Sequence, residues 1–187
     1  YPLSSRFDEN DAILVLDDVF VPWEDVLVLR DAGKILSFHP ASGFMHGSCF
    51  QGCTRLSVKL DFLACLLSKA LRATGGAAVR RNRAMLVQVI AIRHQFWSYS
   101  NAMAYNPIPW ADGAVLPNLE AALSYRTFMS EAYPRVIDII RRVVASGLIY
   151  LPSSAKDFDN PEIDRYLAQY VRGSNDMGHI ERIKIMK

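Results

Sequence analysis

Three side chains close together in the sequence, His46, Cys49 and Cys53, are of the types that bind metal ions or iron–sulfur clusters. Their spacings of three and then four residues would place them along one face of an α-helix. Three ligands spread over two helical turns cannot close around one ion without a fourth ligand from elsewhere. Free cysteines are also among the most buried small residues, so the pattern favours buried thiols over a metal site.

A basic cluster, Arg80, Arg81 and Arg83, follows paired glycines at residues 75–76 and lies at the start of a predicted helix. Guanidinium groups beside the free backbone N–H groups of a helix start are typical of phosphate binding. The simpler interpretation is a solvated basic turn. Spacing alone favours that simpler interpretation.

A second candidate anion site consists of Arg172, Gly173, Ser174 and Asn175. The glycine lies between two predicted helices and interrupts the helical pattern just before the second one begins. A cation, a hydroxyl and an amide would then lie beside free backbone N–H groups. The alternative is a helix C-cap followed directly by an N-cap, which needs no ligand. The residues alone favour this alternative.

Motifs for nucleophilic, zinc-dependent or nucleotide-dependent catalysis are absent: there is no G-x-S-x-G, H-E-x-x-H, P-loop or G-x-G-x-x-G. His94 lies within a predicted helix, which favours a hydrogen-bonded interior histidine over a general base. Residue types and spacing therefore indicate a helical domain with two candidate anion sites.

Composition indicates a globular domain that is 51% apolar and carries a net charge of +2, from 21 basic and 19 acidic residues. This overall balance predicts neither nucleic acid nor an anionic membrane as a partner. No apolar run reaches the roughly 18 residues needed to span a bilayer, and the first residues do not resemble a signal peptide. Three cysteines, an odd number, favour free thiols in a reducing compartment. We therefore expect a cytoplasmic protein.

The element that must position these residues is a long helix over residues 51–73. Its main apolar stripe recurs at spacings of three and four: Cys53, Leu56, Leu60, Leu63, Leu67 and Ala70. A second apolar row, Val58, Phe62 and Leu66, widens the face and predicts that the helix lies inside a bundle.

Two further long helices complete the predicted bundle. Residues 78–104 carry a similar apolar row, and a loop rich in proline and glycine follows at residues 106–117. Asn118 is a plausible N-cap for a helix ending near Ser146 and Gly147, with Pro134 causing a kink or a division. Asn160 predicts the start of a shorter helix that runs to about residue 171, and a final helix follows.

Residues 11–30 have a different pattern, rich in β-branched side chains and interrupted by Asp17 and Asp18. They predict two strands, of which the second ends early at Pro22. Two strands alone are marginal in water, so residues 1–30 are predicted to close a β-domain whose remainder lies outside this chain. Residues 31–187 are then a separate, truncated helical domain.

Long runs of the sequence resemble the oxygenase components of the 4-hydroxyphenylacetate 3-hydroxylase family. These runs are SRFDENDA at residues 5–12, TRLSVKLDFL at 54–63, ASGLIYLPSSAKDF at 145–158, NPEI at 160–163 and YVRGSN at 170–175. The resemblance covers essentially the whole chain and corresponds to the C-terminal portion of the family. It implies a mainly α fold: a C-terminal helical bundle of the acyl-CoA dehydrogenase type, preceded by the last two strands of a middle β-domain.

The resemblance also implies a function. Members are FAD-dependent monooxygenases that take reduced FAD from a separate flavin reductase and use O2 to hydroxylate a phenol beside its hydroxyl group. The expected substrate is a phenolic small molecule, such as 4-hydroxyphenylacetate or a tyrosine-like compound, free or tethered to a carrier. The expected assembly is a homotetramer, a dimer of dimers.

The family's substrate-contacting residues belong to the missing N-terminal domain, so no catalytic residue is predicted in this chain. Arg80 and the residues Arg172, Gly173, Ser174 and Asn175 become candidate FAD contacts. One alternative is a relative of 4-hydroxybutyryl-CoA dehydratase, in which His46 and Cys53 would help to hold an iron–sulfur cluster. Another is a non-catalytic oligomerisation module.

Overall fold

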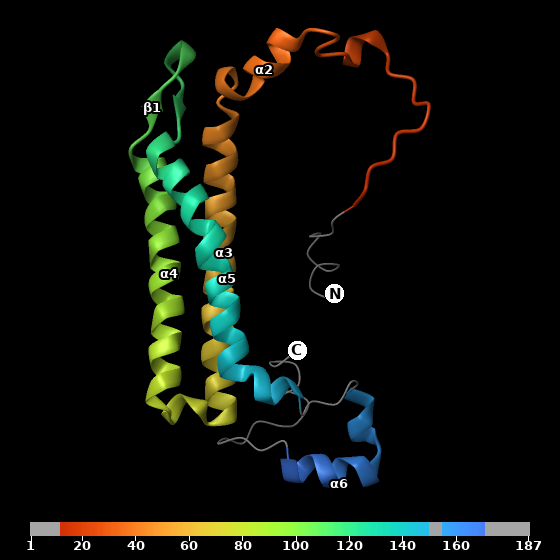
Figure 1. The fold of residues 1–187 in the computed structure, drawn as a ribbon, viewed down its shortest axis with the longest axis vertical. Helices are drawn as coiled ribbons and strands as arrows, with labels where there is room; N and C mark the ends of the chain where they lie inside the picture. The colour runs from red at the N-terminus through yellow and green to blue at the C-terminus, as the bar shows by residue number, and fades with distance from the viewer. Residues whose placement is uncertain (1–11, 150–154, 171–187) are drawn as a thin grey trace. The chain divides into compact units, whose positions relative to one another are not determined.

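The computed structural model describes residues 12–149 and 155–170 of the chain (Figure 1). The chain divides into two compact units, residues 1–38 and residues 39–187. Most of the described structure is helical, which confirms the predicted mainly α fold. None of the described helices is long and apolar enough to cross a lipid bilayer.

The predicted strands within residues 12–30 are not formed. This segment contains one short 3-10 helix, Trp23–Asp25, and is otherwise irregular. Its apolar side chains are open to solvent, with Ile13 92% and Leu27 93% exposed. A strand needs a neighbour to satisfy its backbone N–H and C=O groups, and the described residues offer this segment none. The prediction of paired strands is therefore wrong for this chain by itself.

Helix α2, Ala32–Ala41, links the two units along the sequence. Asp31 caps its start, because the Asp31 carboxylate accepts a hydrogen bond from the backbone N–H of Lys34 at 3.0 Å. The helix continues one residue beyond Pro40.

Helix α3, Phe44–Thr74, is the predicted central helix, extended at its N-terminal end. Gly43 precedes it with a φ of +67°, and a side chain there would lie 2.9 Å from Leu116. At the other end Gly75 adopts a φ of +76° and caps the helix, as the paired glycines predicted. Turn chemistry thus fixes both ends.

The main apolar stripe of α3 is buried as predicted, with Cys53 and Leu60 fully inaccessible. Of the second row, only Leu66 packs against the core. Val58 is 54% and Phe62 53% exposed, so nothing among the described residues covers this side of the helix. Among the described residues, α3 packs against α4 and α5 and leaves its outer side uncovered.

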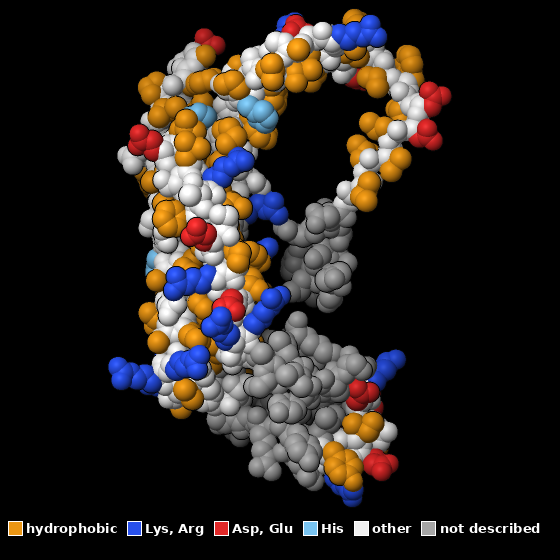
Figure 2. Space-filling view, in the orientation of Figure 1, with side chains coloured by type: hydrophobic (Ala, Val, Ile, Leu, Met, Phe, Trp, Pro, Cys, Tyr) orange, Lys and Arg blue, Asp and Glu red, His pale blue; other side chains and the backbone are white. Residues whose placement is uncertain are grey.

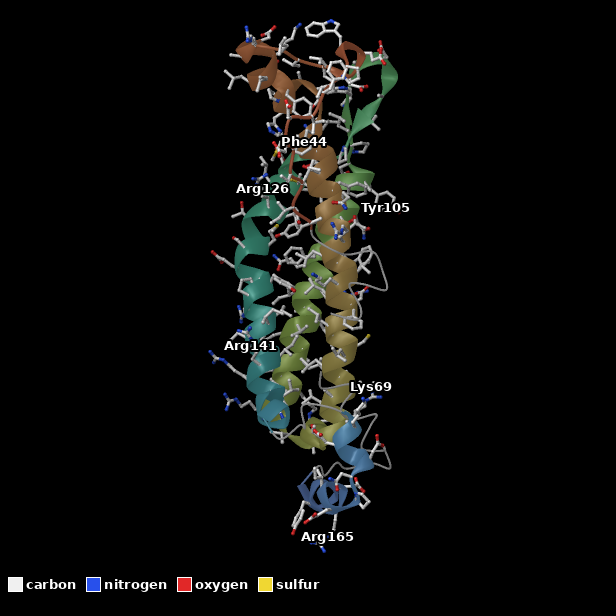
Figure 3. All side chains as sticks on the ribbon, turned by 90° about the vertical axis from the view of Figure 1, so that its right-hand side faces the viewer. Phe44, Lys69, Tyr105, Arg126, Arg141 and Arg165 are labelled. Carbon is white, nitrogen blue, oxygen red and sulfur yellow. The ribbon has the colours of Figure 1, made fainter. Side chains whose placement is uncertain are left out.

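Helix α4, Arg80–Tyr105, runs back along α3, as Figures 1 and 3 both show. The loop expected after it contains a short antiparallel hairpin, in which β1, Ile108–Pro109, pairs with β2, Val115–Leu116. A 3-10 turn, Ala111–Gly113, connects the two strands, with Asp112 and Gly113 at positive φ.

Helix α5, Leu119–Ile149, completes the bundle. The Asn118 side chain accepts a hydrogen bond from the N–H of Ala121 at 2.9 Å, which confirms the predicted N-cap. Pro134 lies inside one continuous helix, and the helix passes through Gly147 instead of ending there. Leu123 is 47% exposed, while the smaller Ala122 is buried.

The core lies between α3, α4 and α5. Phe96 of α4 is fully buried and makes edge-to-face contacts with Tyr99 and Tyr125, each with ring centroids 5.9 Å apart. Tyr125 of α5 approaches α3 so closely that a Cβ on Gly52 would lie 2.8 Å from its hydroxyl. The absence of a side chain at Gly52 therefore permits this close packing.

A shorter helix, α6, spans Pro161–Tyr170 and follows the 3-10 helix Ala155–Asp159. The Asn160 side chain accepts a hydrogen bond from the N–H of Glu162 at 3.0 Å, as predicted for its N-cap. The glycine break after this helix and the final predicted helix lie outside the described residues.

Candidate functional site

The first candidate anion site lies at the turn between α3 and α4. The Asn82 amide donates to the Gly76 carbonyl at 3.1 Å, and the Arg83 guanidinium donates to the carbonyls of Ala77 and Ala78 at 3.1 and 3.3 Å. Arg83 therefore holds the turn together and is not directed at a ligand.

Arg80 and Arg81 occupy the first turn of α4 and are both exposed. Val79, at the N-cap position, contributes no side-chain hydrogen bond to the helix start. Exposed guanidinium groups beside uncapped backbone N–H groups form an arrangement that accepts a phosphate. The second candidate, Arg172, Gly173, Ser174 and Asn175, lies outside the described residues.

His46 and Cys53 are both used in hydrogen bonds within the bundle. The His46 Nδ1–H donates to the Pro117 carbonyl at 2.8 Å, and the Cys53 thiol donates to the Phe96 carbonyl at 3.3 Å. Burial raises the pKa of the Cys53 thiol to about 11, which disfavours the thiolate that a metal ion would need. In the part of the chain that the structure describes, no three His, Cys, Asp or Glu side chains lie close enough together to hold a metal ion.

An open groove between α3 and α4, with a volume of about 920 Å³, was not predicted. Asp61 of α3 pairs with Arg93 of α4 in the groove and also accepts hydrogen bonds from the Trp97 indole, at 3.2 Å to each oxygen. Hydrogen bonding to Arg93, aided by the indole, holds the pKa of Asp61 below its usual range. This aspartate remains ionised and saturated with donors, so it is poorly suited to act as a base.

Cys65 and His94 also line this groove. His94 is exposed and accepts a hydrogen bond from the neighbouring Arg93 at 3.2 Å, so the prediction of an interior histidine is wrong. No signal in the sequence indicated the groove, because no local pattern connects Asp61 with Arg93. Its polar contacts, from Asp61 to Arg93 and to Trp97, join the two helices.

Two family models match the chain. The model described as 4-hydroxyphenylacetate 3-hydroxylase C terminal matches residues 36–187, and the corresponding N-terminal model matches residues 1–28. Together they leave only a short gap, between residues 28 and 36.

Curated relatives match over the whole chain. The chain is 53% identical to a 4-hydroxyphenylacetate 3-monooxygenase oxygenase component of Pseudomonas aeruginosa, covering 100% of this chain and 36% of that protein. It is 52% identical to a monooxygenase of Streptomyces globisporus named for a carrier-bound 3-amino-3-(3-chloro-4-hydroxyphenyl)propanoyl group, covering 35% of it. It is 50% identical to the oxygenase component of a Rhodococcus 4-nitrophenol 2-monooxygenase. The chain thus spans about a third of the length of these relatives.

A solved structure has the same fold. The oxygenase component of a 4-hydroxyphenylacetate 3-monooxygenase, crystallised with FAD, superposes with a TM-score of 0.84 at 23% identity. The match covers 92% of this chain and 36% of that protein.

Proposed function

The chain belongs to the 4-hydroxyphenylacetate 3-hydroxylase family, and we propose that it is the C-terminal part of the oxygenase of a two-component monooxygenase. The observation that carries the proposal is identity of 50% or more to oxygenases that act on different phenols, along the whole chain. A separate flavin reductase is the expected partner of such an oxygenase.

The proposed reaction adds one oxygen atom to a phenol at the carbon beside its hydroxyl group. Reduced FAD would supply the two electrons that let one atom of O2 enter the ring while the other leaves as water. We infer a tyrosine-like phenol, free or tethered to a carrier, because one relative is named for a carrier-bound substrate of that kind. The groups that choose the substrate are expected in the part of the protein that precedes residue 1.

The described residues fit one function toward FAD, which is to bind a phosphate. Arg80 is exposed at the uncapped start of α4, where cationic and backbone donors lie together. We propose Arg80 as a contact to an FAD phosphate, with Arg172, Gly173, Ser174 and Asn175 as a second contact to phosphate or ribose. The chain itself would then bind and orient the flavin without taking part in proton transfer.

We further propose that residues 1–30 close a β-domain in the longer protein and that residues 31–187 form its helical domain. The exposed outer row of α3, Val58 and Phe62, supports packing against further subunits in a homotetramer formed as a dimer of dimers. A cytoplasmic location is consistent with the reducing environment that free thiols favour.

The full-length protein, supplied with reduced FAD and 18O2, tests this proposal against a panel of para-substituted phenols. We expect a catechol that carries one 18O atom, detected by mass spectrometry, from at least one phenol of the panel. Oxygen consumption that yields only hydrogen peroxide with every phenol would contradict the proposal. Iron in the purified protein would support the dehydratase alternative, and assembly without flavin affinity would support the oligomerisation module.

The Arg80 contact is tested separately by measuring flavin affinity. We expect Arg80→Ala to weaken FAD binding by about tenfold, since a charge-assisted hydrogen bond contributes about 1.5 kcal/mol or more. Arg126→Ala removes an exposed guanidinium group from α5, outside this turn, and is the matched control. Equal affinities of the two variants would show that Arg80 does not contact the flavin.

A further inference from the structure

The net charge of +2 hides a separation of charge along the chain. Residues 44–149 contain twelve lysines and arginines against five acids, which leaves a net charge of +7. Residues 1–43 contain three against eight, which leaves a net charge of −5. Figure 2 shows the basic side chains spread over the helical bundle. One polypeptide therefore carries two parts of opposite charge.

Part of this positive charge gathers where α3 and α5 lie side by side. Lys59 of α3 lies over the ring of Tyr133 of α5, 5.4 Å from its centroid, and Arg126 of α5 reaches the sulfur of Met45 of α3 at 3.6 Å. Arg141 lies fifteen residues after Arg126, about 60° from it around α5. Figure 3 shows Arg126 and Arg141 projecting outward from that helix. We call Lys59, Arg126 and Arg141 the basic face.

The nearest acids of the bundle do not neutralise the basic face. Asp61 is paired with Arg93 toward α4, and Asp138 is paired with Arg142 at 2.8 Å. Glu131 lies two residues before Tyr133, on about the opposite side of α5. The three side chains of the basic face are all exposed. The face thus presents cations over a helix whose outer apolar row, Val58 and Phe62, is also uncovered.

The negative part of the chain presents a matching set of charges. Asp17 and Asp18 form one acidic pair, and Glu24 and Asp25 form a second pair seven residues later. All four are exposed, and residues 12–29 contain no lysine or arginine. These acidic pairs complement the cations of the basic face.

We propose that the basic face of one subunit binds the acidic pairs of residues 17–25 in a second copy of this chain. The proposal rests on the homo-oligomer proposed above, and it names the two surfaces that make one of its contacts. A second copy is favoured over an unrelated anion because each copy carries both complementary surfaces. A two-fold axis would then form the contact twice.

Charge reversal in the full-length protein tests this contact. The test variant is Lys59→Glu, Arg126→Glu and Arg141→Glu combined, and the control is Arg81→Glu, Lys156→Glu and Arg165→Glu, which changes the net charge equally. Sedimentation velocity in about 50 mM salt should show a subunit dissociation constant raised at least about tenfold in the test variant only. The difference should shrink near 1 M salt, where charges are screened within about 3 Å.

A reciprocal variant separates loss of contact from loss of folding. The reciprocal variant replaces Asp17, Asp18, Glu24 and Asp25 with lysine. By itself it should weaken assembly, and in combination with the test variant it should restore assembly. Carbodiimide cross-linking of mixed isotopically heavy and light subunits should join Lys59 of one copy to the acids of the other.

The possible failures can be told apart. A monomeric wild-type protein would overturn both the proposed oligomer and this contact. A stable oligomer that is unaffected by the test variant, or cross-links found only within single chains, would overturn this contact alone. The hydroxylation assay is independent of both results.

Discussion

The three-helix bundle and residues 12–29 are both rich in apolar side chains, yet only the bundle buries them. Leu60 and Phe96 in the bundle are inaccessible to solvent, whereas Ile13 and Leu27 are almost fully exposed. The difference follows from hydrogen bonding. A helix satisfies its own backbone hydrogen-bonding groups and needs a partner only for its apolar face. A strand needs partners for its backbone groups and for its apolar face. A mainly helical part of a protein can therefore hold its structure where a strand pair cannot.

The largest expected difference between the two regions comes from removing one aromatic ring from each. In the 187-residue chain, Phe96→Ala should lower the free energy of unfolding by about 3–5 kcal/mol, because it leaves a cavity in a packed core. Phe20→Ala removes the same ring from an exposed site and should change the free energy of unfolding by less than about 0.5 kcal/mol. Urea titration measures both, and a comparable loss in the two variants would show that residues 12–29 are packed.

A smaller effect is expected from two glycines of α3. Gly52→Ala should destabilise the bundle by about 1–3 kcal/mol, because the new methyl group meets the buried Tyr125 hydroxyl. Gly47→Ala lies in the same helix with nothing within 4 Å of the new Cβ, so it should stabilise by up to about 1 kcal/mol. Thermal unfolding should move in opposite directions for the two variants. Stabilisation by both would contradict the close α3–α5 packing.

The start of α5 provides a third test within the bundle. Asn118→Ala removes the side-chain cap of that helix and should cost about 1 kcal/mol. Asn101→Ala, at an exposed position inside α4, is the control and should have little effect or stabilise slightly. Chemical denaturation distinguishes them. Equal stabilities would mean that the cap contributes nothing.

The smallest effect concerns the Asp61–Arg93 pair in the groove. Because the pKa of Asp61 is lowered in the folded state, its stabilisation is present above the unfolded-state value of about 3.9 and is lost as the pH falls below it. Asp61→Asn should therefore reduce stability at pH 7 by less than about 1 kcal/mol and flatten its acid dependence, since the pair is partly exposed. Asp112→Asn, in the exposed hairpin turn, should leave the acid dependence unchanged. An unaltered pH profile in Asp61→Asn would contradict the role of this pair.

The sequence predicted the helices well where a local signal marks their ends. Gly75 ends α3 at a positive φ, and Asn118 and Asn160 cap the starts of α5 and α6. These signals depend on backbone chemistry within a few residues. They therefore mark the helix ends independently of how distant parts of the protein pack.

Other features could not be read from the sequence because they depend on packing at a distance. In α5 the close approach of the helices buries the small Ala122 and leaves the larger Leu123 exposed, which residue type alone does not indicate. The hairpin in residues 108–116 was missed because each of its strands has only two residues. The Asp61–Arg93 pair joins residues 32 positions apart, and no local pattern connects them. The charge separation was visible in the sequence, but the overall balance concealed it.

The candidate site was only partly predictable for the same reason. Arg80 could be placed because a glycine turn and a helix start define its surroundings locally. Arg83 and Asn82 were not distinguished from it, although both are used to hold the turn. Which of several neighbouring cations remains available to a ligand depends on which carbonyls the folded turn brings within reach.

The most direct test of the central contrast is hydrogen exchange in the 187-residue chain and in the full-length protein. The account predicts that amides of residues 12–29 exchange within seconds in the shorter chain and are at least about a hundredfold slower in the longer one, where the preceding domain supplies their partners. Amides in the middle of α3, α4 and α5 should be protected in both. Unprotected residues 12–29 in the full-length protein, or an unprotected bundle in the shorter chain, would contradict the account.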